Sequence, residues 1–350
     1  MGANEHVPAW TPSSLIRTLR DQYRQRRFIG GATPLRRLAR FSQVIGVEVF
    51  AKRDDEASFA FAGAKARKLE MVLGTALAQG YEALITMGPP QSNTCRALAA
   101  ACAGAGLQAH LVLAGDPPKD LSGNALLAAI LGAQIKWVGP LEHSKLEAAL
   151  VERARELNKS GLRTLTVSAG CSDVRGIMGM AAGYAEMMNQ CEKLGVEPAE
   201  IVHASATGGI WAGLELGAAL LGGARPIAAL VVDNLFADTR ATYADLFNSA
   251  SAALGLTERR TSDEVRVDAS EVAGGYGQPS PECLDAIALL ARTEGIVCDP
   301  IYTGKALAVL IRRARSGLID GPVVFWHSGG VQTLGDHGVV QTLNQRFNVQ

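Results

Sequence analysis

A glycine-rich segment at residues 205–213, with the sequence SATGGIWAG, has the composition of an anion-binding turn. It follows the apolar run at residues 201–204, so we expect a strand, a tight turn and a helix start in succession. Several backbone N–H groups and the positive helix end then converge on one point, which suits a phosphate group. The segment is not GxGxxG and lacks the Walker lysine, which disfavours a dinucleotide or a nucleoside triphosphate. A tight turn without a ligand is the alternative.

Lys65 is a candidate amine nucleophile. It stands between small residues in the segment AGAKARKLE, residues 62–70, after a glycine that allows close backbone approach. A lysine near a helix N-terminus and other cations can have a lowered pKa and act as a nucleophile or form a Schiff base. The alternative is a solvated lysine on a basic helix. Lys68, three residues further on, competes with Lys65 for the chemical role.

The segment QSNTC, residues 91–95, places polar side chains in front of an alanine-rich stretch. Ser92 or Asn93 could be a helix N-cap, which is worth about 1 kcal/mol to a helix. The same exposed N–H groups and side chains could instead clamp a carboxylate. The residues alone favour neither interpretation.

Two tyrosines lie beside glycines in the C-terminal part of the chain, Tyr276 in GGYGQP and Tyr302 in DPIYTGK. A tuned tyrosine can transfer a proton, whereas each ring alone could simply be packed with its hydroxyl in water. The segment WHSGG, residues 326–330, ends an apolar run with a small polar turn. Open α/β sheets bind their ligands at such strand ends.

The elements that must position these segments follow from the hydrophobic pattern. Short β-branched runs alternate with Ala- and Leu-rich stretches, which is typical of βαβ units and parallel sheets. The expected strands are residues 47–51, 83–87, 109–113, 134–138, 164–167, 201–204, 227–232 and 323–327. The expected helices are residues 68–79, 95–105, 142–157, 177–194, 211–221, 281–293 and 304–316. Residues 233–277 are the least regular region, and the predicted fold class is α/β.

Composition narrows the functional class. The chain has 350 residues with 34 Lys plus Arg and 34 Asp plus Glu, and this zero net charge argues against a nucleic-acid partner. The longest weakly polar stretch, residues 97–115, is too polar for a membrane span. The six cysteines form no CxxC pair and the six histidines no HExxH motif, so we expect neither a metal nor a disulfide framework. The first ten residues lack a signal-peptide pattern, so the expected location is cytoplasmic.

In chain order, these segments resemble the pyridoxal-phosphate enzymes of the fold-type-II branch that contains D-cysteine desulfhydrase and 1-aminocyclopropane-1-carboxylate deaminase. The resemblance runs from TPL at residues 33–35 through KRDD, KARKLE, QSN, AGCSD, GYG, ARTEGI and DPIYTGK to HSGG. It implies a fold like that of the tryptophan synthase β-subunit, with two doubly wound open-sheet domains and pyridoxal 5′-phosphate in the cleft between them. Residues 1–68 and 176–350 would form the large domain and residues 69–175 the small one. It also implies a homodimer.

The resemblance implies cofactor contacts for the residues that match. Lys65 would carry the cofactor as a Schiff base and then move the α-proton of the substrate. Asn93 would bind the ring hydroxyl, and Thr303 would be the partner of the pyridine nitrogen. The phosphate would be held mainly by backbone N–H groups of the loop that contains Thr207, Gly208, Gly209 and Ile210.

It also implies contacts with a small amino-acid substrate. Ser92 would hold the substrate carboxylate or assist as a nucleophile or base, with Asn93 and Thr94 beside it. Tyr276 and Tyr302 would face the substrate.

Thr303 helps to choose the reaction. A ring-opening deaminase of this family has a carboxylate at the matching position, which keeps the pyridinium protonated and strengthens the electron sink. A neutral threonine provides a weaker sink, which suits β-elimination, as in the desulfhydrases, to give a 2-oxo acid and ammonia. The alternatives are ring opening, which AGCSD at residues 169–173 favours, and β- or γ-replacement. A non-catalytic binding protein is a further alternative.

The chain departs from the family pattern at several site positions. Ala64 stands where the family has asparagine, Thr94 where it has histidine, and Ile210 where it has a small polar residue. Lys65, Asn93 and the glycines are retained, so we expect cofactor binding to survive. The changes together predict a specialised substrate, bulkier or less polar than cysteine.

Overall fold

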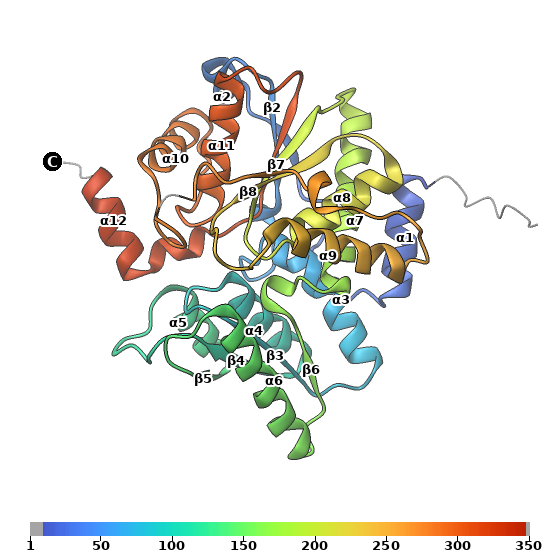
Figure 1. Ribbon diagram of the computed structural model, residues 1–350, viewed down its shortest axis with the longest axis vertical. Helices are drawn as coiled ribbons and strands as arrows, with labels where there is room; N and C mark the ends of the chain where they lie inside the picture. Colours follow the sequence, from blue (N-terminus) through green and yellow to red (C-terminus); the bar gives the residue numbers. More distant parts are fainter. Residues whose placement is uncertain (1–9, 273, 348–350) are drawn as a thin grey trace, which may run out of the picture.

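The fold is built on two separate sheets that lie one above the other in Figure 1, a computed structural model that describes residues 10–272 and 274–347. The six-stranded sheet has the order β1-β2-β10-β7-β8-β9, and the four-stranded sheet has the order β5-β4-β3-β6. The strands of the first are β1 (Leu35–Arg37), β2 (Val49–Arg53), β7 (Glu200–Ser205), β8 (Arg225–Leu230), β9 (Val267–Asp268) and β10 (Val323–His327). The strands of the second are β3 (Ala83–Gly88), β4 (Gln108–Leu113), β5 (Gln134–Trp137) and β6 (Thr164–Thr166).

Within the two sheets every strand pair is parallel except β1 with β2. Parallel strands need helices on both faces of the sheet, and their central strands are therefore buried throughout. Every residue of β3, β7 and β10 is buried accordingly. The predicted α/β class with two open parallel sheets is confirmed.

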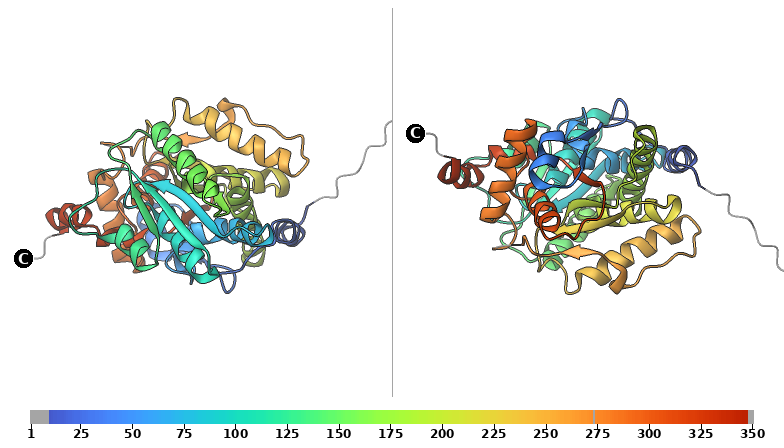
Figure 2. Two further views of the ribbon diagram at one scale, coloured as in Figure 1. Left: turned by 90° about the horizontal axis from the view of Figure 1, so that it is seen from below. Right: turned by 90° about the horizontal axis from the view of Figure 1, so that it is seen from above.

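Helices cover both sheets. They are α1 (Pro12–Gln22), α2 (Ala39–Ile45), α3 (Ala64–Ala78), α4 (Asn93–Ala105), α5 (Gly123–Ile130), α6 (His143–Lys159), α7 (Val174–Leu194), α8 (Gly209–Leu221), α9 (Thr239–Ala253), α10 (Pro281–Glu294), α11 (Thr303–Arg315) and α12 (His337–Phe347). All three views place α1 and α12 at opposite sides of the molecule (Figures 1 and 2). No helix in the described part of the chain is long and apolar enough to cross a membrane.

Side chains alternate along the strands, so each sheet has a separate hydrophobic core on each of its two faces. In β10, Val323 and Phe325 pack with α2, α10 and α11, whereas Val324 and Trp326 pack with α7 and α8. In β3, Leu84 joins the core under α3 and α4, and Ile85 joins the core under α6. The period of two in a strand sends successive side chains to opposite faces, so each sheet is covered on both.

All eight strands expected from the sequence form, with ends that shift by at most two residues. The strands missed are the three-residue β1 and the two-residue β9, which are too short to show a pattern. Residues 233–277, expected to be the least regular region, contain an α-helix that was not predicted, α9, of 15 residues. Its signals were the Asp238 N-cap and the spacing of Tyr243 and Phe247, which bury one face of an otherwise polar helix.

The two sheets draw on different parts of the sequence. Every strand of the four-stranded sheet lies between residues 83 and 166, inside the expected small domain. The six-stranded sheet combines strands from both sides of that insertion, because β2 lies beside β10 in the sheet. Helix α3, which carries Lys65 in its first turn, packs against both α7 of the large-sheet side and α4 of the four-stranded-sheet side. Residues near its start can therefore be held from both domains.

Candidate functional site

A cavity of about 400 Å³ opens between the two sheets, within the range of roughly 300–1,000 Å³ that is usual for small-molecule sites. Segments that follow β3, β7, β8 and β10 line it, so it lies at the carboxyl ends of strands from both sheets. The predicted site residues on its wall are Lys65, Ser92, Asn93, Thr94, Thr207, Gly208, Gly209, Ile210, Tyr276 and Tyr302. Thr303 is the predicted residue that does not line it.

Lys65 lies in the first turn of α3 and is half-buried. The turn before it needs glycine, because Gly63 has φ +57° and a Cβ there would lie 2.1 Å from the backbone oxygen of Ser328. The same contact lets the Ala64 N–H donate to that oxygen at 3.1 Å. Burial lowers the pKa of the Lys65 amine, and no hydrogen bond joins Nζ to any residue in the described ranges. The amine is therefore a candidate nucleophile that faces the cavity.

The glycine-rich turn between β7 and α8 forms a cradle of N–H groups. Gly208 is the N-cap of α8 in the left-handed region, with φ +78°. The Gly209 N–H donates to Ser172 Oγ at 3.2 Å, and that hydroxyl lies 2.7 Å from Thr207 Oγ1. A Cβ on Gly209 would lie 2.5 Å from Ser172 Oγ and 2.7 Å from Lys68 Nζ. The helix dipole and the free N–H groups of the first turn favour an anion at this turn.

Lys68 lies at this cradle rather than at the nucleophile's position. It is fully buried, and its Nζ donates to the Gly170 backbone oxygen at 3.1 Å. Burial, followed by the charge of Lys65, lowers the pKa of Lys68 well below its ordinary value. No described carboxylate forms an ion pair with Lys68, so an anionic group in the cradle would supply its missing counter-charge. The residues therefore fit a phosphate group.

Helix α4 begins on the opposite wall of the cavity. Ser92 is its N-cap, and the Ser92 Oγ accepts a hydrogen bond from Cys95 N at 3.2 Å. The hydroxyl hydrogen of Ser92 is still available, so capping and a ligand contact are compatible. Asn93 and Thr94 occupy the first turn and also line the cavity.

Tyr276 and Tyr302 meet through their hydroxyl groups, and their rings pack edge to face with centroids 5.8 Å apart. Burial raises the pKa of Tyr276 to about 12 and raises that of Tyr302 well above its ordinary value. Both groups are therefore neutral at physiological pH. One hydroxyl donates to the other, which leaves one O–H of the pair to donate into the cavity.

Thr303 lies behind the cavity wall. It is fully buried, its Oγ1 donates to Asp299 Oδ1 at 2.6 Å, and the Asp299 N–H donates back to it at 3.1 Å. Ser328, which directly follows β10, does line the cavity. The strand-end segment WHSGG signalled this position, but its residues received no individual role from the sequence.

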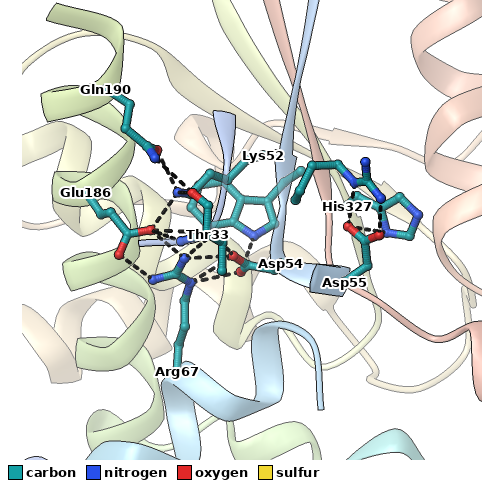
Figure 3. Close-up of polar contacts among 10 residues, drawn as sticks. Thr33, Lys52, Asp54, Asp55, Arg67, Glu186, Gln190 and His327 are labelled. Carbon is teal, nitrogen blue, oxygen red and sulfur yellow. Dashed lines mark hydrogen bonds and ion pairs between the residues drawn. The ribbon is translucent and has the colours of Figure 1, made fainter. Parts of the chain in front are cut away.

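A buried ion network supports α3 from the large-sheet side (Figure 3). The Arg67 guanidinium contacts Asp54 through both Nε and Nη2 and also donates to Glu186 at 2.8 Å. Lys52 pairs with Glu186 at 2.6 Å, and the Trp326 indole donates to Asp54 at 2.8 Å. The KRDD segment was noticed in the sequence without a role. Its partners on α7 and β10 lie more than 130 residues away, so no local pattern could identify them.

Comparison with known proteins agrees with this geometry. The family model described as pyridoxal-phosphate dependent enzyme matches residues 27–329. A crystal structure described as an ACC deaminase homologue is 31% identical, with a TM-score of 0.86, over 93% of this chain and 98% of that one. A crystal structure of the threonine deaminase of T.th. is 20% identical, with a TM-score of 0.62, over 90% of this chain and 97% of that one, and supports the fold alone.

Proposed function

The chain belongs to the family of pyridoxal-phosphate dependent enzymes, and from this premise we propose that it catalyses β-elimination on a small amino acid to give a 2-oxo acid and ammonia. Its fold is fold type II and its cofactor is pyridoxal phosphate. The finer part of the proposal is a carbon–sulfur lyase of the D-cysteine desulfhydrase kind. The homodimer and the cytoplasmic location implied by the sequence belong to the same proposal.

Four groups on the cavity wall would hold the cofactor. Lys65 offers an amine for its aldehyde, and Lys68 together with the N–H groups at the start of α8 suits its phosphate. Asn93 offers a side-chain amide for the ring hydroxyl. We assign the pyridine nitrogen to the Ser328 hydroxyl rather than to Thr303, whose hydroxyl is already bonded to Asp299. When bound, pyridoxal phosphate supplies an electron sink for the charge left on the α-carbon.

The remaining wall residues would handle the substrate and its protons. The Ser92 hydroxyl and the N–H groups that open α4 would bind the substrate carboxylate. The Lys65 amine, with its pKa lowered by burial, would take the α-proton. The spare O–H of the Tyr276–Tyr302 pair would donate a hydrogen bond or a proton to the departing group.

One observation carries elimination over ring opening: Ser328, a residue with a neutral hydroxyl, lines the cavity at the end of β10. Among the described residues that line the cavity, the only carboxylate belongs to Glu142, which caps α6 on the four-stranded-sheet side. A hydroxyl does not keep a pyridine nitrogen protonated as a carboxylate does, so the electron sink is weaker. Prompt departure of a good leaving group from the β-carbon then becomes the favoured outcome.

The test begins with the visible absorbance of the purified protein, before and after addition of pyridoxal phosphate. Borohydride reduction followed by peptide mapping should place the cofactor on Lys65. Lys65→Ala should abolish this attachment, whereas Lys145→Ala, on the exposed side of α6, should not.

Product assays then identify the reaction. We expect 2-oxo acid and ammonia from D- or L-cysteine or from a bulkier β-substituted amino acid. Release of 2-oxobutanoate from 1-aminocyclopropane-1-carboxylate, without elimination from any β-substituted amino acid, would refute the proposal. A cofactor that binds and exchanges without any product would favour the non-catalytic alternative.

A further inference from the structure

Arg96, on the first turns of α4, is a buried guanidinium that reaches two neighbouring segments. It is 1% exposed, and its Nε donates to Asn124 Oδ1 at 2.8 Å. Its Nη2 donates to the Phe61 backbone oxygen at 3.0 Å, and its Nη1 donates to the backbone oxygen of Ala60. No carboxylate in the described part of the chain forms an ion pair with it. All three of these contacts are to neutral oxygen atoms.

These contacts determine the orientation of the Asn124 side chain. An arginine can only donate, so Asn124 must turn its oxygen toward Arg96. The Asn124 Nδ2 then donates to the Gln91 backbone oxygen at 2.9 Å and to Asn93 Oδ1 at 3.0 Å. A backbone oxygen can only accept, so the two ends of the Asn124 amide are specified independently and agree.

The orientation of Asn93 follows in turn. Because Asn124 donates to it, Asn93 must present its oxygen to Asn124 and keep its Nδ2 on the other side. Asn93 lines the cavity, and no residue in the described ranges accepts a hydrogen bond from that Nδ2. Asn93 therefore brings to the site a neutral side-chain donor that has no partner among the described residues.

The other arm of Arg96 holds the turn that leads to Lys65. Ala60 and Phe61 both lie in the left-handed region, with φ of +44° and +54°, which is unfavourable for residues other than glycine. Burying a charge is unfavourable, and here the buried Arg96 guanidinium donates to the backbone oxygens of Ala60 and Phe61, just before α3 begins. One guanidinium therefore contacts the turn before Lys65 and the chain of amides that ends at Asn93.

We propose that Arg96 and Asn124 are positioning residues that keep the Asn93 amide nitrogen pointed at the ring oxygen of the bound cofactor while they hold the turn before Lys65. This inference rests on the proposed function, because the ring oxygen belongs to pyridoxal phosphate. A donor stabilises the ionised form of that oxygen. Asn124 acts on the cofactor without touching the cavity, through the orientation that it imposes on Asn93.

Asn124→Asp tests the orientation with almost no change in shape. An aspartate still accepts from Arg96 but cannot donate, so Asn93 must turn its nitrogen toward residue 124 and its oxygen toward the cofactor. We expect the dissociation constant of pyridoxal phosphate to rise about tenfold. The pH midpoint of the visible absorbance of the bound cofactor should move upward by about one unit.

Asn248→Asp is the matched control. Asn248 likewise donates to a backbone oxygen, that of Arg260 at 3.0 Å, and accepts from the Arg260 N–H at 2.8 Å, but it does not line the cavity. The dissociation constant of pyridoxal phosphate and the pH midpoint of the Asn248→Asp variant should match those of the wild type. If Asn124→Asp does not fold, as judged by circular dichroism, Asn124→Ala should raise the dissociation constant by a smaller factor, because Asn93 is then free to turn either way.

A double-mutant cycle separates positioning from general support. If Asn124 acts through Asn93, the double variant Asn93→Ala/Asn124→Asp should bind the cofactor as Asn93→Ala alone does. If the two substitutions multiply their effects on the dissociation constant in the double variant, the inference is wrong while the proposed function stands. The same conclusion follows if a folded Asn124 variant has the binding and the pH midpoint of the wild type. Wild-type protein that never acquires cofactor absorbance would overturn both.

Discussion

Two buried arginines flank the start of α3 in opposite electrostatic surroundings. Arg67 is 6% exposed and faces two carboxylates, whereas Arg96 is 1% exposed and is bonded to neutral oxygens. Burial lowers the pKa of Arg96 to about 10, so it is still charged at neutral pH. Burial would also lower the pKa of Arg67, but Asp54 and Glu186 together raise it.

The difference separates two functions of a buried cation. On the large-sheet side, Lys52 and Arg67 face Asp54 and Glu186, so the charges cancel and the network mainly joins α3 to β2, α7 and β10 (Figure 3). On the four-stranded-sheet side, no described carboxylate pairs with Arg96, which is linked to the cavity by two hydrogen bonds, through Asn124 and then Asn93. The first arrangement joins neighbouring elements of the fold, whereas the second, in our proposal, orients Asn93 toward the cofactor.

The largest effect should come from neutralising each arginine in turn. Arg67→Met leaves Asp54 and Glu186 buried without their main partner, and we expect a loss of about 3–5 kcal/mol in the free energy of unfolding. Arg96→Met leaves only neutral oxygens unpaired and also removes a buried charge, so about 1–3 kcal/mol should be lost. Urea unfolding of both variants measures the difference, and a larger loss for Arg96→Met would contradict the comparison.

The pH dependence of the free energy of unfolding should come mainly from the network in which Arg67 and Lys52 pair with Asp54 and Glu186. Burial opposes ionisation of Glu186, but Arg67 and Lys52 outweigh it and lower its pKa from 4.5 to about 2. The stabilisation is complete above the unfolded value and is lost as the pH falls toward 2, because the unfolded chain binds the proton first. It amounts to about 3 kcal/mol.

Glu186→Gln should therefore cost the most above pH 5 and progressively less below it. Urea unfolding of wild type and variant between pH 5 and pH 3 gives the two slopes. Asp285→Asn, in an exposed pair with Arg346, is the control and should change stability by less than about 1 kcal/mol at any of these pH values. Parallel curves for Glu186→Gln and wild type would mean that the network does not hold Glu186 ionised.

The smallest effect concerns the turn that Arg96 holds. Phe61 is 65% exposed and has φ +54°, so Phe61→Gly should relieve backbone strain with little loss of packing. We expect a gain of about 0.5–1 kcal/mol from thermal or urea unfolding. Val44→Gly, at a 55% exposed position inside α2, should instead lose about 0.5 kcal/mol. A loss in both variants would show that the Phe61 turn is not strained.

Local patterns in the sequence were enough to predict much of the fold and part of the site. The strand ending at Ser205, the glycine turn and the helix that follows appear where hydrophobic runs and glycines predicted them. An N-cap at Ser92 or Asn93 was one of two interpretations of QSNTC, and Ser92 is the cap in the structure, because capping uses neighbours three residues away. For Thr303, the resemblance implied a contact with the pyridine nitrogen, and its local partner Asp299, four residues earlier, was overlooked. Whether its hydroxyl faces the cavity depends on Asp299, whose buried carboxylate accepts a hydrogen bond from that hydroxyl.

By itself, the sequence determined the alternation of strands and helices, the turn that carries Lys65, the glycine-rich turn before α8, and the order of motifs that marks the family. Those features depend on periodicity and on turn chemistry within a few residues. Only the tertiary structure decided that Lys68 lies at the cradle, that Ser328 is on the wall, and that Arg96 reaches Asn93 through Asn124. These three features depend on the packing of two sheets whose strands come from distant parts of the chain. They also depend on which hydrogen-bond donors are left without partners once that packing is complete.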